Sequence, residues 1–109
     1  MRELLKRNNR PDALFCHNDL VAFGAMRAMV ESSVRVPEDV AVAGFDDIPE
    51  ARFHNPSLTT IRQPVDEIGR RLVELLLSRI ENPEESPQTA VLNSELVVRE
   101  STVGRRREP

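Results

Sequence analysis

Two short polar clusters in the sequence have side chains that suit the binding of a small polar molecule. His17-Asn18-Asp19 follows one apolar run, and Phe45-Asp46-Asp47 follows another. A carboxylate such as Asp46 accepts two hydroxyl hydrogens, and an amide such as Asn18 both donates and accepts. The ring of Phe45 can cover the apolar face of a sugar. Together these side chains indicate a site for a polyol.

The apolar runs before the two clusters are typical of strands that are buried on both faces of a parallel sheet. They are Ala13–Cys16 and Val40–Phe45. The pattern between them predicts a helix over Asp19–Glu31, so strand, helix and strand form a βαβ unit with a right-handed crossover. Ligands of open parallel sheets bind beyond the carboxyl ends of the strands, and both clusters are expected at that edge.

Several of these polar residues also have a structural alternative. Asn18 is a good N-cap for the predicted helix. Asp47 is typical of the cap of a short helix, because Glu50 follows three residues later as in a capping box. Asp46 occupies neither cap position, which makes it the stronger candidate for a ligand contact. His17 is either a surface or interface residue or a ligand contact.

The rest of the chain continues the alternation of helices and strands. A helix end is predicted at Glu3–Asn9 and a strand at Leu58–Arg62. Pro64 suits the first position of a second long helix, which runs to about Glu81. Its single apolar stripe consists of Val65, Ile68, Leu72, Leu75, Leu76 and Ile80. Thr89–Val98 is the last predicted strand.

The helix over Asp19–Glu31 carries more apolar surface than one sheet contact needs. Its apolar side chains span about 220° at 3.6 residues per turn, whereas packing on one sheet needs an apolar stripe of about 100°. The surplus indicates a second contact, such as a subunit interface, unless neighbouring elements of the same chain cover it. Gly24 in the middle of the helix indicates close backbone packing at that point.

The composition excludes several classes of function. The 109 residues carry a net charge of −3, the wrong sign for a nucleic-acid groove binder. Because Cys16 is the only cysteine, neither an internal disulfide nor a cysteine-rich metal site is expected. There is no P-loop, GxGxxG motif or nucleophile-elbow serine, so we expect no enzyme, cofactor or metal. No secretion signal or membrane-spanning run is present, so a cytoplasmic protein without a membrane partner is expected.

Longer motifs resemble the LacI/GalR family of bacterial transcription regulators. They are PDALFCHNDLVAFGAMRAM, RVPEDVAVAGFDDIPEARFHNPSLTTIRQP, IGRRLVELLLSRIE and SELVVRES. The resemblance covers about Arg10–Ser101. Members of this family join an N-terminal helix-turn-helix domain to a two-lobed effector domain like that of periplasmic sugar-binding proteins. They usually act as homodimers or tetramers.

The resemblance implies both a fold and a function. The fold is α/β, a partial periplasmic-binding-protein-like domain in which helices flank a parallel sheet. Residues 10–62 are assigned to the C-terminal lobe, residues 64–88 to a helix and loop of the N-terminal lobe, residues 89–103 to a return strand and residues 104–109 to a tail. The function is sensing of a sugar or nucleoside-like effector. Operator DNA is contacted only through a helix-turn-helix domain that these 109 residues do not include.

The resemblance also implies site residues. Positions that match Asn18 and Asp46 line the effector pocket in the family, and the chemistry of Phe45 adds it to this set. The homodimer interface is expected at Leu20, Phe23, Arg27, Phe53 and His54. Cys16, His17 and Ser33 depart from the family, which often has small residues at the first two positions and a helix-ending glycine at the third. A transport-type sugar-binding protein with the same lobes is the alternative function.

Overall fold

The computed structural model describes residues 1–7 and 9–103, and the tail predicted at residues 104–109 lies outside this range. The chain forms two compact units. The first contains residues 1–62 together with the chain from Glu95 onward, and the second is Gln63–Ser94. Within the described residues, no helix combines the length and the apolar character needed to cross a membrane.

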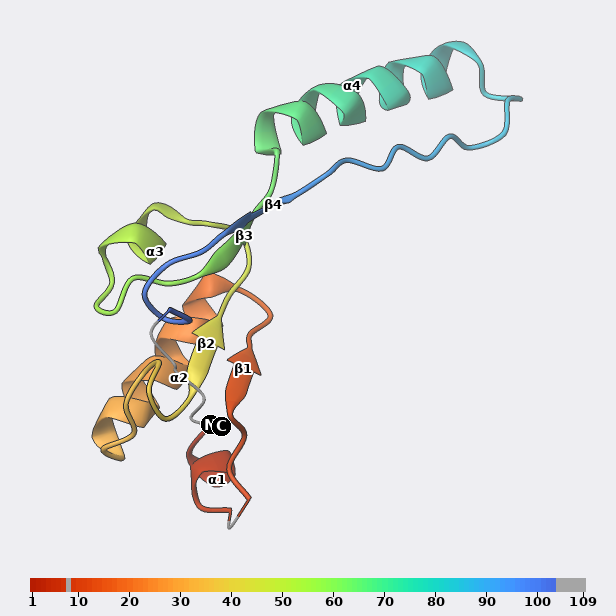
Figure 1. The fold of residues 1–109 in the computed structure, drawn as a ribbon. Helices are drawn as coiled ribbons and strands as arrows, with labels where there is room; N and C mark the ends of the chain where they lie inside the picture. Colours follow the sequence, from red (N-terminus) through yellow and green to blue (C-terminus); the bar gives the residue numbers. More distant parts are fainter. Residues whose placement is uncertain (8, 104–109) are drawn as a thin grey trace, which may run out of the picture. The chain divides into compact units, whose positions relative to one another are not determined.

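The first unit is built on a βαβ arrangement. β1 (Ala13–Phe15) pairs in parallel with β2 (Ala41–Ala43), and α2 (Asp19–Glu31) connects them. Figure 1 shows the two strands side by side, with α2 packed along them. These elements confirm the predicted α/β fold and both ends of the predicted helix. The helix end predicted at Glu3–Asn9 is α1 (Arg2–Leu5), which stops earlier than expected.

A second pair of strands brings the end of the described chain back to the first unit. β3 (Thr60–Arg62) pairs with β4 (Glu95–Val97), and this pairing is antiparallel. The strand predicted over Thr89–Val98 is therefore too long, because only its last part finds a partner. Residues 89–94 belong to the second unit, which contains no strand within the residues described.

β3 and the residue before it also lie beside the end of β2 and the chain that follows β2, outside the two regular strand pairs. Single parallel bridges join Ala43 to Thr59 and Asp46 to Arg62. The chain that leaves β2 therefore runs alongside β3 for several residues before it turns into α3 (Pro49–Phe53). This extension fixes the backbone of the second polar cluster.

The core of the first unit lies between α2 and the sheet. It consists of Cys16, Ala22, Ala25, Met26, Met29, Val34, Val40, Val42, Ala51 and Leu58. Leu20, Val21 and Val30 of α2 remain exposed, so the chain covers only part of the predicted apolar arc. The close backbone packing predicted at Gly24 is wrong within this chain, because a Cβ there would meet nothing within 4 Å.

α2 ends in a left-handed turn at Ser33, whose φ is 57°. Ser33 N donates to the carbonyl of Val30 at 3.1 Å, and Val34 N donates to the carbonyl of Met29 at 2.9 Å. These two hydrogen bonds form the Schellman motif in which glycine usually occupies the left-handed position. α2 therefore ends in a Schellman motif, with serine in the position that glycine usually occupies.

The second unit consists of α4 (Val65–Glu81) and the extended chain that follows it. Pro64 is the N-cap of α4 and not its first helical residue. Residues 82–94 run back beside α4, and Asn82 and residues 85–88 line a groove of about 330 Å³ with the last turns of α4. Leu72, Leu76 and Ile80 of the predicted stripe are nevertheless more than half exposed. Figure 1 shows α4 with the irregular, extended chain beside it.

Candidate functional site

The two polar clusters meet at the carboxyl ends of β1 and β2. Cys16 N donates to the carbonyl of Ala43 at 2.8 Å, which continues the pairing beyond β1. Asp19 N then donates to the carbonyl of Phe45 at 3.0 Å. This hydrogen bond joins the first residue of α2 to the chain leaving β2. As the parallel topology predicts, Asn18 and Phe45 come from neighbouring strand ends.

Asn18 is the N-cap of α2, as expected from its position before the helix. Its backbone is extended, and its Oδ1 accepts a hydrogen bond from Val21 N at 2.9 Å. The cap uses the carbonyl oxygen of the side chain and not its Nδ2 group. An amide has donors and acceptors on separate atoms, so the cap and a ligand contact through Nδ2 are compatible.

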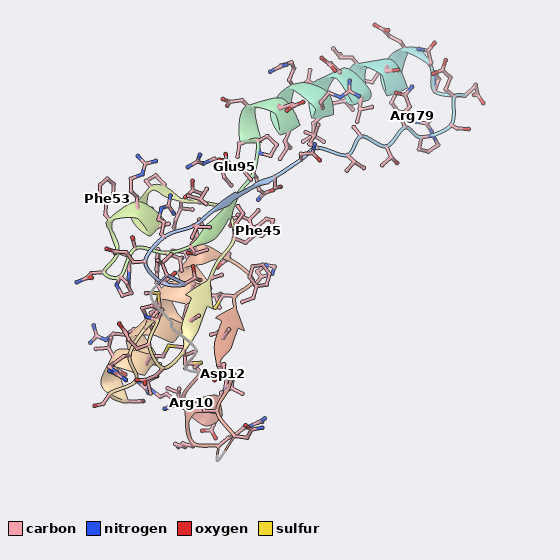
Figure 2. All side chains as sticks on the ribbon, in the orientation of Figure 1. Arg10, Asp12, Phe45, Phe53, Arg79 and Glu95 are labelled. Carbon is pink, nitrogen blue, oxygen red and sulfur yellow. The ribbon has the colours of Figure 1, made fainter. Side chains whose placement is uncertain are left out.

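Asp46 has an unusual backbone that the parallel bridge to β3 holds in place. Its φ is 112°, and its N–H donates to the carbonyl of Ile61 at 2.9 Å. The residue is half-buried, as is Phe45. Figure 2 shows Phe45 just beyond the end of β2. A left-handed aspartate costs free energy and is often found at functional positions.

Asp47 does not cap α3, so the predicted capping box is wrong. The N-cap of α3 is Ile48, and no side chain caps this helix. The carboxylate of Asp47 instead pairs with Arg62 Nε and with Arg99 Nη2, both at 2.6 Å. Burial favours the neutral carboxyl, but the hydrogen bonds from the two guanidinium groups outweigh it and lower the pKa of Asp47. The left-handed φ of 54° at Asp47 belongs to the turn that precedes α3.

Asp19 plays a larger part than its position in the first turn of a helix suggests. It is completely buried. Its Oδ2 accepts from Ile48 N at 2.9 Å, and its Oδ1 accepts from Thr60 Oγ1 at 2.5 Å. The space for this carboxylate exists because residue 44 is glycine, since a Cβ on Gly44 would lie 2.3 Å from Asp19 Oδ1.

Sequence reasoning missed Arg62, Arg99 and Thr60 as neighbours of the site. The sequence contains one signal for the arginines. Two adjacent acidic residues follow a buried strand, and buried carboxylates are usually paired with cations. Arg62 ends the next strand along the chain. Arg99 lies 52 residues beyond Asp47, and no periodic pattern connects positions so far apart.

The predicted interface residues lie on α2 and around the end of α3. Leu20, Phe23 and Arg27 follow the i, i+3, i+7 spacing of one helix face. The rings of Phe23 and His54 are stacked, with centroids 4.6 Å apart. Phe53 is 81% exposed, and Figure 2 shows it on α3. An exposed phenylalanine near a stacked aromatic pair is apolar surface that the described chain leaves uncovered.

Cys16 and His17, which depart from the family pattern, have different environments. Cys16 is buried, and burial raises the pKa of its thiol. His17 is exposed. Both line a groove of about 780 Å³ between α1, β1 and α2, and Val21, the partner of the Asn18 cap, also lines it.

Comparisons with known proteins agree with this geometry. The family described as periplasmic binding protein-like domain matches residues 1–102. The ribose operon repressor of Haemophilus influenzae is 45% identical over 101 residues, which are 93% of this chain and 30% of that protein. The chain thus spans about a third of the length of the curated relatives it matches.

Solved structures give the same result. A LacI-family transcriptional regulator of Sanguibacter keddieii is 41% identical with a TM-score of 0.85, over 94% of this chain and 39% of that one. The complex of the transcriptional regulator CelR with cellobiose is 43% identical with a TM-score of 0.83, over 92% of this chain and 31% of that one. The chain therefore belongs to the family of periplasmic binding protein-like domains, in the form that LacI-type transcription regulators contain.

Proposed function

We propose that this chain is the effector-sensing and dimerising portion of a cytoplasmic LacI-type transcription regulator, and that it is not an enzyme. Residues 10–62 are assigned to the C-terminal lobe of the effector domain, residues 64–88 to a helix and loop of the N-terminal lobe, and residues 89–103 to the strand that returns to the C-terminal lobe. The boundary at Gln63 supports this assignment, although the chain rejoins the first unit only at Glu95. In this proposal a helix-turn-helix domain elsewhere in the regulator contacts the operator.

The hydrogen bond from Asp19 N to the carbonyl of Phe45 is the observation that carries the proposal. It joins the backbone that carries Asn18 to the backbone that carries Phe45 and Asp46, at one edge of the sheet. An amide donor, a carboxylate acceptor and an apolar ring match a molecule with several hydroxyl groups and an apolar face. The effector is therefore proposed to be a sugar or a related polar molecule such as a nucleoside.

The names of the relatives support the same class of ligand. One relative is a ribose operon repressor, and one solved structure contains cellobiose. D-ribose and cellobiose are therefore the first probes. Asp46 accepts hydroxyl hydrogens, Asn18 contributes its Nδ2 donor, and Phe45 packs against the carbon face of the ring.

The homodimer interface is proposed to be the face of α2 that carries Leu20, Phe23 and Arg27, together with Phe53 and His54. Leu20 and Phe53 are highly exposed in the single chain. Contiguous patches of exposed apolar side chains mark protein interaction sites. The guanidinium of Arg27 pairs with Glu31 at 2.9 Å, which places a charged pair at the rim.

Two measurements on the regulator that carries this chain test the function. Calorimetric titration with D-ribose, cellobiose, adenosine and inosine is expected to show micromolar binding of at least one of them. Binding of the regulator to its own promoter DNA is then expected to change when that ligand is added. Ligand binding by a protein with no affinity for DNA would favour the transport-type binding protein, and absence of both activities would overturn the proposal.

A further inference from the structure

Asp19 holds both ends of the segment that carries the proposed ligand residue Asp46. Its backbone N–H donates to the carbonyl of Phe45 at 3.0 Å, and its Oδ2 accepts from Ile48 N at 2.9 Å. The segment between these contacts contains both left-handed aspartates of the chain leaving β2. One buried residue at the start of α2 therefore brackets residues 45–48.

The second carboxylate oxygen of Asp19 ties the same segment to β3. Oδ1 accepts from Thr60 Oγ1 at 2.5 Å, and Thr60 Oγ1 in turn accepts from Asp47 N at 3.3 Å. Asp46 N donates to the carbonyl of Ile61, so β3 supports the segment from the other side. Both carboxylate oxygens are satisfied, and Asp19 and Thr60 are completely buried.

Gly44 packs directly against Asp19. A Cβ at this position would lie 2.3 Å from Asp19 Oδ1 and 3.2 Å from Asp19 Cα. A side chain there would force the start of α2 away from the end of β2. The short distance between these two elements thus depends on the pairing of an aspartate with a glycine.

We propose that Asp19 is the positioning residue of the candidate site, which fixes Asp46 relative to Asn18 without touching the ligand. Asn18 is its neighbour in sequence, and Asp46 lies inside the bracketed segment. With no exposed surface, Asp19 is unable to reach a ligand itself. The ligand part of this inference rests on the proposed function, whereas the positioning part concerns only the geometry of this chain.

Three variants separate positioning from general stability. Asp19→Asn keeps the size of the side chain but replaces one acceptor with a donor. Thr60→Val removes the hydroxyl that links Asp19 to Asp47, and Thr60→Ser retains it. The matched control is Asp39→Asn, because Asp39 is also a hydrogen-bonded carboxylate but lies before β2, at the end of the strand away from the site.

Amide hydrogen exchange of the 109-residue chain, measured by NMR, gives the first readout. In Asp19→Asn and Thr60→Val, exchange of the Asp47 and Ile48 amides is expected to rise about tenfold or more, because each change leaves a buried group of the bracket without its partner. Exchange at Val42 in the core and at Val21, which the Asn18 cap protects, is expected to stay the same. Thr60→Ser and Asp39→Asn are expected to behave as the wild type.

Three results overturn the positioning role. The first is unchanged exchange at Ile48. The second is a uniform rise that includes Val42, and the third is failure of both Asp19→Asn and Thr60→Val to fold. In the last two cases Asp19 would serve only general stability.

Binding of D-ribose to the regulator that carries this chain gives the second readout. Asp19→Asn is expected to weaken binding about tenfold in the wild type and to have no further effect in an Asp46→Ala background, because its effect passes through Asp46. Equal losses in both backgrounds would contradict the proposal. If the wild-type regulator does not bind D-ribose, the choice of ligand fails, while the exchange experiment still decides the role of Asp19.

Discussion

Asp47 and Arg99 lie 52 residues apart in the sequence, and Asp47 Oδ1 accepts a hydrogen bond from Arg99 Nη2 at 2.6 Å. Asp47 Oδ2 accepts from Arg62 Nε at the same distance. Arg62 ends β3 and Arg99 follows β4, so one carboxylate ties both strands to the segment that carries Asp46. The side chains of Asp47 and Arg99 are only 6% and 11% exposed, and water therefore screens their attraction weakly.

We predict that Asp47→Asn lowers the free energy of unfolding and makes that free energy less dependent on pH in the acid range. Breaking a buried ion pair costs about 3 kcal/mol or more, because the remaining charge loses its partner. The hydrogen bonds from Arg99 and Arg62 lower the pKa of Asp47 in the folded chain despite its burial. A carboxyl of this kind contributes stability that is fully present above about pH 4, its pKa in the unfolded chain, and is lost as the pH falls from there through the folded pKa.

Urea unfolding of the purified chain between about pH 7 and pH 2 measures this effect, since the wild type should lose more stability than Asp47→Asn below about pH 4. Glu3→Gln is a suitable control, because Glu3 and Lys6 form an ion pair on the exposed surface. Parallel curves for wild type and Asp47→Asn would show that the pairing has no influence on acid stability.

A second prediction concerns the end of α2. Ser33 has a φ of 57° in a position that glycine prefers, so Ser33→Gly is expected to raise the free energy of unfolding by about 1 kcal/mol. The neighbouring Ser32 has a φ of −104°, and Ser32→Gly is expected to lower stability by about 0.5–1 kcal/mol, because it only adds freedom to the unfolded chain. Denaturant unfolding compares the two. A shift in the same direction for both variants would rule out this explanation.

The third prediction is that Asp46 binds effector hydroxyl groups. Loss of a charged hydrogen-bond partner in a desolvated pocket costs about 1.5–3 kcal/mol, so Asp46→Ala in the full regulator should weaken binding by one to two orders of magnitude, in the range of about 10- to 150-fold. Asp66→Ala removes an exposed carboxylate from the first turn of α4 and serves as the control. Calorimetry measures the affinity of both variants for the effector that the sugar and nucleoside titrations identify. Wild-type affinity in Asp46→Ala would exclude Asp46 as a ligand contact.

The fourth prediction places Phe23 in a homodimer interface. Phe23→Arg puts an unpaired charge into an apolar contact and removes the ring stacked on His54. We expect the dimer to dissociate into monomers in sedimentation-velocity measurements. Val91→Arg introduces the same charge at a highly exposed position of the second unit and should leave the dimer intact. Identical sedimentation of wild type and Phe23→Arg would show that the interface lies elsewhere.

The sequence predicts the helices better than the strands. Both ends of α2 follow from local signals, which are the Asn18 cap and the loss of apolar periodicity after Glu31. The end of α4 at Glu81 follows in the same way from Pro83. Strand length depends on a partner, and residues 89–94 have a strand-like pattern without one. Local composition does not reveal whether a partner strand is available.

Within the candidate site, the predictions succeed where chain neighbours decide and fail where distant residues do. The Asn18 cap involves Val21, three residues away. Asp47 was assigned to a cap because Glu50 is close in sequence, but its partners are strongly basic side chains from β3 and from the chain after β4. Two hydrogen bonds from guanidinium cations outweigh one hydrogen bond from a neutral backbone N–H. Local sequence does not predict the contacts of Asp19 either, because 41 residues separate it from Thr60.

The last prediction is that the 109-residue chain alone, as a monomer, does not form a working effector site. Asn18, Phe45 and Asp46 all belong to one compact unit, and pockets for small molecules surround most of the ligand's surface. The exposed apolar side chains of α4 also favour association of the chain, because burial of each of Leu72, Leu76 and Ile80 contributes about 1.5–3 kcal/mol. We expect the isolated chain to associate, with the surplus apolar face of α2 at the contact, and to bind sugars and nucleosides no more tightly than about the millimolar range. Calorimetry of the purified chain against D-ribose, cellobiose, adenosine and inosine, with sedimentation to establish its oligomeric state, measures both properties. Micromolar binding by a monomer would show that these 109 residues contain the whole site.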